Sequence, residues 1–433
     1  MSTIVSDNLI SAGYLLVWIL TLIWYQRKNP LWDGGSTIII TYIIWAAFSI
    51  CTINDPMSAK MYVYLPLKVF PYIFLYLMLM IALSPAIQIH LNTYNKIEEP
   101  RTRVLEWIAI MCIVCGLCQV PGMLSNPSGI MKLITDTDAG KDAYTEAMDN
   151  VGDSGSAISN LTSVIFNAFY DICVFIGFYF ITLKKPKKWI LYGLFACMVI
   201  GFLDPLLSGQ RSPVMMHLFS IVLGFMFFKH LMAPKIVRGA RILGVSCLIL
   251  LSIPVVALTL SRFGNRAEAA IGTYMTWYMG QCNPYFNNYA LDDNGIRYGD
   301  RTINLVKRLV DSDTPKNYVE RREKYHHLFI DDNLFVTFVG DFCIDFGPYI
   351  AVVIFLIFNG YVLIKTRPKD KVMKLHQLLL LFFTMNICIQ GGMYLFSYSD
   401  TANLQVLMII MLYAYLRYHE VLLEKFPIKL KKS

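Results

Sequence analysis

The chain has 433 residues, of which 56% are hydrophobic and only 16% are charged, with a formal net charge of +8 and a mean hydropathy of +0.50. Soluble globular domains contain about 25% charged residues, so this composition excludes an ordinary soluble protein. Apolar runs of about 18 residues or more recur along the chain, and each is long enough to cross a hydrocarbon core of about 30 Å. We therefore predict an all-α polytopic membrane protein with a single transmembrane helical domain over residues 1–433.

The first apolar run has no basic residue ahead of it and is preceded by Asp7. This pattern argues against a cleaved signal peptide and predicts a retained first helix. About eleven transmembrane helices are expected in all. They cover approximately residues 7–26, 35–54, 67–89, 104–124, 161–183, 189–207, 213–231, 242–260, 349–365, 375–397 and 401–417.

Basic residues predict the orientation of these spans, because short cytoplasmic loops retain Lys and Arg. Every short connection that is rich in basic residues falls on the same side of the membrane. With an odd number of spans, the N-terminus is then outside and the C-terminus is cytoplasmic. The basic groups are Arg27-Lys28, Lys96 with Arg101 and Arg103, Lys184 to Lys188, Lys229 with Lys235, Arg238 and Arg241, Lys365 to Lys374, and the tail from Arg417 to Lys432.

Two connections on the predicted outer side are long. Residues 125–160 are acidic and rich in Ser and Gly, which is typical of a solvated loop. Residues 261–348 form the longest polar interval of the chain and carry many Lys and Arg residues. A long loop can be translocated despite its charge, so this external loop does not reverse the predicted orientation.

Within the second loop, residues 302–310 have an amphipathic pattern. Ile303, Val306, Leu309 and Val310 would lie on one face of a helix, with basic residues beside them. The pattern resembles an interfacial helix on the outer leaflet.

Ionisable residues inside or beside a span need a physical reason, because inserting one costs about 2.5–3.5 kcal/mol. Asp171 lies in the middle of a predicted span, where it would form either a buried polar site or a hydrogen bond between helices. Asp204 and Arg211 flank a predicted outer hairpin, where they could form an ion pair or where Arg211 could face a substrate. His217, further along the same helix, could pack between helices or face that cavity.

Cys112, Cys115 and Cys118 recur every three residues on one predicted helix, a pattern that favours packing of small apolar side chains over a metal site. His326 and His327 are adjacent in the external loop, and no His-x-x-x-His or carboxylate spacing accompanies them, so no metal is expected. Cys282 and Cys343 lie in or beside the same loop and could pair in an oxidising compartment, although no spacing requires it.

Two motifs and the topology together resemble a known family. The motifs are the turn Ser208-Gly209-Gln210-Arg211 and the segment Thr337-Phe338-Val339-Gly340-Asp341-Phe342-Cys343-Ile344-Asp345-Phe346-Gly347. With a large external loop between them, they resemble the bacterial oligosaccharide repeat-unit polymerases, the Wzy-type O-antigen and capsule polymerases. The match covers roughly residues 200 to 360. Asp332-Asn333 stands where the related O-antigen ligases tend to carry His-Asn, which leaves the identity of the general base open.

The resemblance implies a glycosyltransferase that polymerises undecaprenyl-diphosphate-linked repeat units into an O-antigen, capsule or exopolysaccharide. Because the donor already carries a good leaving group, neither a cofactor nor a metal is needed. Arginine forks suit the binding of a diphosphate, and a carboxylate or histidine must take the proton of the acceptor hydroxyl. The candidate residues are Arg211, Arg262 and Arg266 for the diphosphate, and Asp345 or His327 as the base, with Asp341 and Asp332 behind them.

This interpretation predicts a multi-pass protein of the bacterial cytoplasmic membrane that acts at the outer face by an inverting transfer. Its partners would be the polyprenyl-linked donor and acceptor, the bilayer and a chain-length regulator, with no nucleic acid. The alternatives are an O-antigen ligase and a lipid-linked oligosaccharide flippase or other transporter. A transporter would concentrate its charges along an internal path, whereas these charges gather at one face.

Overall fold

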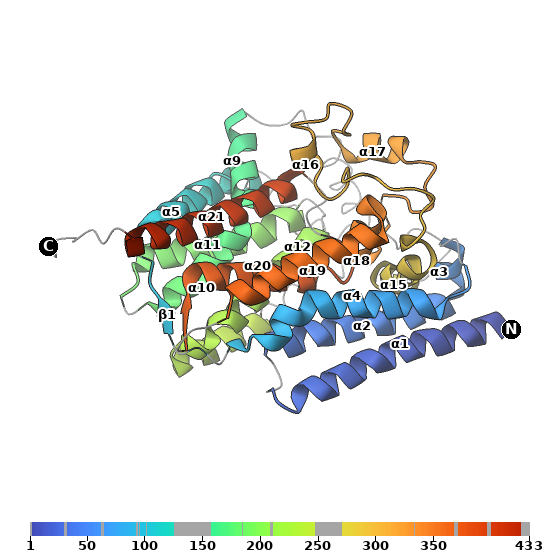
Figure 1. Cartoon of the computed structure of the whole chain (residues 1–433). Helices are drawn as coiled ribbons and strands as arrows, with labels where there is room; N and C mark the ends of the chain where they lie inside the picture. Colours follow the sequence, from blue (N-terminus) through green and yellow to red (C-terminus); the bar gives the residue numbers. More distant parts are fainter. Residues whose placement is uncertain are drawn as a thin grey trace.

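The structure is a computed structural model, and we describe residues 2–29, 33–61, 65–91, 94, 96–100, 102–124, 157–183, 185–207, 211–246, 271–332, 334–367, 371–395 and 400–425. Almost all of the regular structure in these residues is helical (Figure 1). Two three-residue strands are the exception. The described part of the chain is therefore all-α, as the composition predicted.

Most of the long helices of the N-terminal half run along a similar direction (Figure 1). Their bounds are α1 Ser2–Gln26, α2 Gly34–Asn54, α3 Pro56–Met61, α4 Val69–Gln88, α5 Val104–Leu117, α6 Val120–Leu124, α9 Ala157–Ala168, α10 Tyr170–Thr182, α11 Lys188–Leu207, α12 Arg211–Phe228 and the short 3-10 turn η2 Lys229–Leu231. The later elements are α14 Ile271–Gly280, α15 Cys282–Tyr285, the π-helical turn η3 Phe286–Ala290, α16 Asn304–Lys307, α17 Tyr318–Lys324, α18 Thr337–Phe346, α19 Pro348–Lys365, α20 Leu375–Gln390 and α21 Asp400–Lys425.

Seven of the described helices are long and apolar enough to cross a membrane. An eighth span is present if the bent pair of α9 and α10, which meet at 55°, is one crossing. These helices confirm a polytopic membrane protein, and the expected number of eleven is met only in part. Residues 247–260 of the expected span 242–260 lie outside the described residues, α20 has only 16 residues, and α21 is not among the apolar set.

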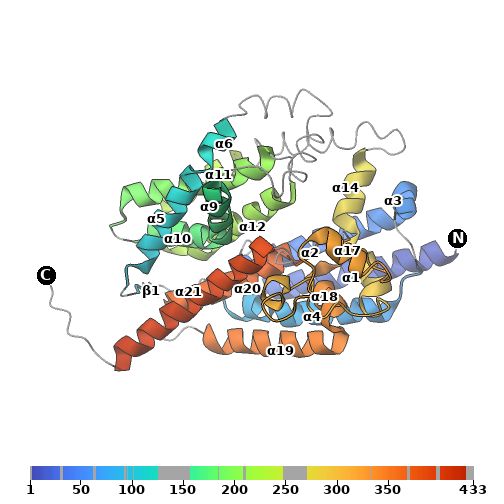
Figure 2. The same ribbon diagram turned by 90° about the horizontal axis from the view of Figure 1, so that it is seen from above.

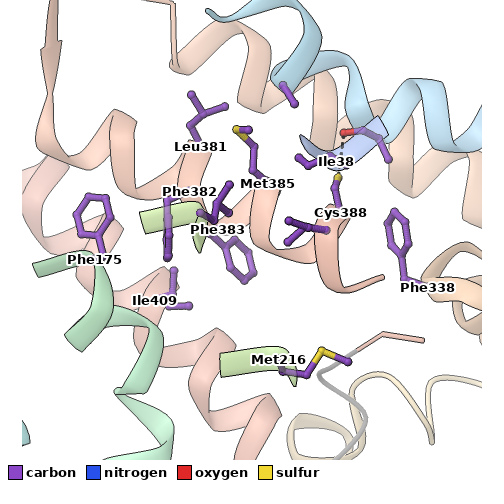
Figure 3. Close-up of a cluster of buried hydrophobic side chains, with 14 of the residues drawn as sticks. Ile38, Phe175, Met216, Phe338, Leu381, Phe382, Phe383, Met385, Cys388 and Ile409 are labelled. Atoms are coloured by element: carbon purple, nitrogen blue, oxygen red, sulfur yellow. Dashed lines mark hydrogen bonds between the residues drawn. The ribbon is translucent and has the colours of Figure 1, made fainter. Parts of the chain in front are cut away.

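Helix α20 forms the centre of the core although it is short. Fourteen of its sixteen residues are buried, because the run Leu378 to Phe383 is apolar on every side. A helix that is apolar all round must be surrounded by protein or lipid, and α20 contacts α2, α4, α12, α19 and α21. Figure 3 shows its side chains among residues of several other helices, and Phe382 meets Phe175 of α10 at a ring-centroid distance of 5.4 Å.

A buried polar network joins α20 to α10 and α12. Ser220 Oγ donates a hydrogen bond of 2.5 Å to Asp171 Oδ1, and Asn386 Nδ2 donates one of 2.8 Å to Asp171 Oδ2. Gln390 Nε2 extends the network by donating to Asn386 Oδ1 at 2.9 Å. Asp171 therefore makes the interhelical hydrogen bonds that were one of its two predicted roles, and these bonds offset the cost of its burial.

His217 has a packing role in this region. Its ring stacks on Tyr170 at a centroid distance of 3.8 Å, and its Nδ1 lies 2.6 Å from the carbonyl oxygen of Gly201. Both neighbours belong to adjacent helices, so the imidazole fills a gap between α10, α11 and α12.

The two ends of the helical bundle differ. At one end, β1 (Lys96–Glu98) pairs in parallel with β2 (Val372–Lys374), which ties the α4–α5 connection to the α19–α20 connection. At the other end lie α14 to α18, over the ends of α2, α4 and α19 (Figures 1 and 2). The strand pairing thus joins two connections that are rich in basic residues and that were predicted to lie on the same side of the membrane.

Both predicted external loops lie partly outside the described residues. Of residues 125–160, the structure describes only 157–160, and these four already belong to α9, so the predicted loop ends earlier than expected. Of residues 261–348, the structure describes 271–332 and 334–348, and they are folded into short helices and turns rather than an open loop. We call residues 271–346 the folded segment.

Helix α14 begins the folded segment and packs closely on α2 through Gly280. A Cβ atom added at Gly280 would lie 2.2 Å from the carbonyl oxygen of Phe48 and 2.0 Å from Thr52 Oγ1. Thr52 Oγ1 also donates a hydrogen bond of 2.8 Å to the carbonyl oxygen of Thr276. The absence of a side chain at residue 280 is therefore what allows the two helices to approach.

We expect Gly280→Ala to destabilise the protein, because the methyl group would force α14 away from α2. Overpacking of this kind costs about 1–3 kcal/mol. The measurement is the midpoint of thermal unfolding of the purified protein in detergent. Gly272→Ala is the matched control on the same helix, because a Cβ there meets nothing within 4 Å. Equal melting of the two variants would contradict the close approach.

Candidate functional site

A buried carboxylate that binds three arginines organises the folded segment. Asp332 Oδ1 lies 3.0 Å from Arg297 Nη1 and 2.9 Å from Arg301 Nη1, and Asp332 Oδ2 lies 2.6 Å from Arg321 Nη2. All four residues are buried. Burial alone would raise the pKa of Asp332, but the three guanidinium groups outweigh it and lower this pKa to about 2. Asp332 is therefore ionised at neutral pH and holds three parts of the segment together.

Helix α18 connects this ionic cluster to the helical bundle. Asp341 Oδ1 lies 2.8 Å from Arg301 Nε, and Asp341 Oδ2 accepts a hydrogen bond of 2.5 Å from the backbone N–H of Leu395. Four residues later, Asp345 Oδ2 accepts one of 2.7 Å from the backbone N–H of Thr302. The two carboxylates face the interior of the segment, as their helical spacing of four allows.

Burial raises the pKa of Asp345 to about 6 and also raises the pKa of Asp341. Both side chains are 0% exposed, and that of Asp332 is 2% exposed. The structure therefore places three of the four predicted proton-transfer residues inside the segment, where they bind arginines and backbone N–H groups.

His327 is the fourth predicted proton-transfer residue, and its side chain is exposed. Its backbone carbonyl oxygen accepts a hydrogen bond of 3.4 Å from Asn294 Nδ2, so it lies beside residues 292–294. The neighbouring His326 places its Nδ1 2.7 Å from the carbonyl oxygen of Glu323. Of the four predicted residues, His327 is the one on the surface of the folded segment.

The arginines predicted to bind a diphosphate are not placed by the structure. Arg262 and Arg266 lie outside the described residues, as does Asn333, and Arg211 begins α12 with a side chain that is not described. The five arginines described between residues 271 and 346 all pair with carboxylates. These pairs are Arg297 and Arg301 with Asp332, Arg321 with Asp332, Arg308 with Asp400, and Arg322 with Asp331.

A second carboxylate, Asp300, gathers the basic residues of the segment surface. It pairs with Lys307, and its Oδ2 lies 2.8 Å from Lys324 Nζ and 2.7 Å from the hydroxyl of Tyr325. Burial would raise the pKa of Asp300, and these three partners lower it. Sequence reasoning missed Asp300 and the buried arginines. The available signal was the near balance of acidic and basic residues between positions 292 and 345, which favours internal ion pairs over an open loop.

The start of α21 is bound to the folded segment. Asp400 accepts a hydrogen bond of 2.7 Å from Asn304 Nδ2 and pairs with Arg308. One turn later, Asn403 Nδ2 donates to the carbonyl oxygen of Thr302 at 3.2 Å. Residues 301–308 of the folded segment are therefore fixed both to α18 and to α21, on two sides of the space beneath them.

That space is an apolar cavity of about 320 Å³. Its lining comes from the folded segment and from α4, α18, α19, α20 and α21, and includes Thr302, Ile303, Val306, Phe338, Phe342, Phe355, Phe383, Ile387, Val406 and Ile410. The amphipathic stretch 302–310 contains only one helical turn, α16, and Ile303 and Val306 face this cavity. Leu309 and Val310 are 82% and 87% exposed.

Cys282 and Cys343 are both buried free thiols, so the structure does not pair them. Among the residues that the structure describes, no group of three or more His, Cys, Asp or Glu side chains is placed to hold a metal ion. The described charges of the site thus act through ion pairs and hydrogen bonds.

We expect Asp332→Asn to loosen the folded segment, because three buried arginines would lose their shared charge. Removing one partner from a buried ion pair costs about 3–5 kcal/mol. The measurement is the rate of tryptic cleavage within residues 297–324 of the purified protein. Asp331→Asn is the matched control, since its pair with Arg322 is a surface pair, with side chains that are 40% and 42% exposed. Equal cleavage rates in the two variants would show that the cluster does not hold the segment.

Comparison with known proteins gives no match: no family model matches the sequence, and no curated protein and no solved structure matches the chain.

Proposed function

We propose that the protein is a glycosyltransferase that polymerises polyprenyl-diphosphate-linked oligosaccharide repeat units into a surface polysaccharide. One observation carries this proposal: an apolar cavity lies directly beneath an ordered polar segment at one end of a bundle of membrane helices. A substrate with a lipid chain, a charged diphosphate and a glycan needs these environments next to each other. The sequence motifs described above support the same reaction class.

The cavity suits a segment of a polyprenyl chain. Its volume of about 320 Å³ is at the lower end of the range of about 300–1,000 Å³ for ligand sites. Aromatic and branched aliphatic side chains make up most of the lining, with Thr302 and Asn403 at the side of the folded segment. A lipid chain bound there would place its diphosphate next to that segment.

Arg211, Arg262 and Arg266 are the proposed ligands of the diphosphate. The five described arginines of the folded segment already neutralise carboxylates. A diphosphate needs cationic groups that are not committed in this way, and an arginine fork can bind two of its oxygens at once. The negative charge that develops on the leaving diphosphate would be stabilised by the same groups.

The transfer needs a base for the acceptor hydroxyl. Of the four predicted residues, His327 has the exposed side chain, and histidine is the side chain that most often acts as a general base. Asp332, Asp341 and Asp345 instead keep the folded segment in place through their buried contacts. We propose an inverting reaction that requires no cofactor or metal.

The proposed location is the bacterial cytoplasmic membrane, with the folded segment outside and the C-terminus in the cytoplasm. The basic connections support this orientation. The β1–β2 pair, which joins two of these connections, lies at the opposite end of the bundle from α17 (Figure 1).

We expect Val406→Trp to slow polymerisation about tenfold with a full-length polyprenyl donor. The indole would occupy the cavity and displace one or two methylene groups of the lipid chain, each of which contributes about 0.8 kcal/mol when buried. The measurement is the length distribution of glycan made in proteoliposomes from purified lipid-linked repeat units. With a donor that has a short prenyl chain, the same substitution should reduce the rate of polymerisation much less. Met411→Trp is the matched control on α21, since Met411 is 60% exposed and does not line the cavity.

Equal slowing of long-chain and short-chain donors, or by Val406→Trp and Met411→Trp, would refute the lipid assignment. The reaction class has its own readout in a strain that lacks this chain. If this strain still transfers single repeat units to their acceptor, the missing protein is a polymerase. Long polymer that stays unattached indicates a ligase, and repeat units retained at the cytoplasmic face indicate a flippase.

The proposed orientation predicts that Lys316→Cys is labelled by a membrane-impermeant maleimide in intact spheroplasts, whereas Glu99→Cys is labelled only after lysis. Both residues are exposed; Glu99 directly follows β1 and Lys316 shortly precedes α17, and these two elements lie at opposite ends of the bundle (Figure 1). The unsubstituted protein gives the background from native cysteines. The reverse labelling pattern would place the folded segment in the cytoplasm and exclude the proposed function.

A further inference from the structure

Two aliphatic side chains, those of Leu309 and Val310, project from the surface of the folded segment, and each is more than four-fifths exposed. They follow Ile303 and Val306, which are 43% and 40% exposed. Single exposed apolar residues are common on protein surfaces, but a gathering of four within eight residues indicates an interaction surface. We call Leu309 and Val310 the apolar tip.

The backbone N–H groups around the apolar tip are bonded within one turn of the chain. Those of residues 307 to 311 donate to the carbonyl oxygens of Ile303, Asn304, Val306 and Lys307 over distances of 2.9 to 3.2 Å. The hydrocarbon of a bilayer contains no water, so a segment that enters it must satisfy its backbone donors internally. The turn meets this requirement at each of these donors.

The two cations beside the apolar tip are neutralised by carboxylates. Lys307 pairs with Asp300 and with Asp311, and Arg308 pairs with Asp400 at the start of α21. They therefore add little attraction for anionic lipid head groups, and the affinity of the turn for a membrane comes from its apolar side chains. The same pairs hold the turn to its neighbours, so the tip is kept in its exposed position.

The apolar tip is close to the end of the membrane helices. Val306, one turn before the tip, shares the apolar cavity with Ile354 of α19. Ile354 lies six residues, or about 9 Å, beyond the start of this membrane span at Pro348. Asp400, which binds the turn, is the first residue of α21, and Figure 1 shows α16 beside the start of this helix. The tip therefore lies near the level at which a bilayer around α19 would end.

The size and composition of this surface favour lipid over a protein partner. A stable protein interface buries about 800 Å² on each side and is enriched in aromatic residues and Arg. The apolar tip consists of two aliphatic side chains, and the cations next to it are already paired. A bilayer has no such requirement, because it accepts any apolar side chain that reaches its hydrocarbon.

We propose that Leu309 and Val310 insert into the leaflet at this end of the helical bundle and anchor the folded segment to the membrane. The sequence predicted an interfacial helix over residues 302–310. The contact is confined to the last two of these residues, because Ile303 and Val306 contribute to the wall of the apolar cavity. The anchor does not depend on the reaction proposed above. It keeps the part of the segment that covers the apolar cavity at a constant height relative to the lipid.

The test is photocrosslinking of the full chain in vesicles of phosphatidylcholine. A benzoylphenylalanine residue replaces Val310 in one variant, and mass spectrometry of the tryptic peptide 309–316 detects a lipid adduct. Val319 is the matched control position, because it is 58% exposed on α17 of the same segment. Tyr349, which is 87% exposed at the start of the membrane span α19, is the positive control. We expect adducts at positions 310 and 349, and at least tenfold less at position 319.

Absence of an adduct at position 310 while position 349 gives one, or equal yields at positions 310 and 319, would overturn the anchor. Crosslinks from position 310 to a second copy of the chain would overturn it as well. The yield at position 310 should be unchanged when anionic phosphatidylglycerol is added to the vesicles, since Lys307 and Arg308 are already paired. Adducts that form only with the anionic lipid would show an electrostatic contact and would refute insertion of the apolar tip.

Discussion

The folded segment depends on one arrangement, the binding of three guanidinium groups by the buried carboxylate of Asp332. Charges removed from water must be paired at close range, and a carboxylate has room for several donors. The three arginines come from two stretches of the chain, around residues 297–301 and at residue 321, so their common partner fixes how those stretches pack. Arg301 also pairs with Asp341, which connects the arrangement to α18 and so to the membrane helices.

A second cavity, of about 290 Å³, is lined by residues 290–298 with Cys343 and Pro348, and it is more polar than the apolar cavity. Phe342 of α18 lines the apolar cavity, and the next residue, Cys343, lines the polar one. The two cavities therefore lie on different sides of one short helix, which Arg297 contacts through a backbone hydrogen bond of 3.0 Å to Ile344. Helix α18 therefore contributes to the walls of both cavities, and the ionic cluster holds this helix through the pair of Arg301 and Asp341.

The sequence predicted what depends on composition and local pattern. Long apolar runs gave the membrane class, and the spacing of Asp341 and Asp345 anticipated a helix with both carboxylates on one face. The sequence could not show that these carboxylates are buried, because their partners, Arg301 and Thr302, lie about 40 residues away and are chosen by tertiary packing. Asp300 was missed for a similar reason, because the fold is what brings Lys307, Lys324 and Tyr325 to it.

The parallel pair β1 and β2 has a mechanical consequence for the apolar cavity. The pairing holds the connection after α19 to the connection before α5, and β2 continues directly into the central helix α20. At the same side, Gln377 Nε2 donates a hydrogen bond of 2.8 Å to the carbonyl oxygen of Lys365, which holds the end of α19 to the start of α20. A bulky chain that enters between α19 and α20 would therefore separate them at the other end, near Pro348.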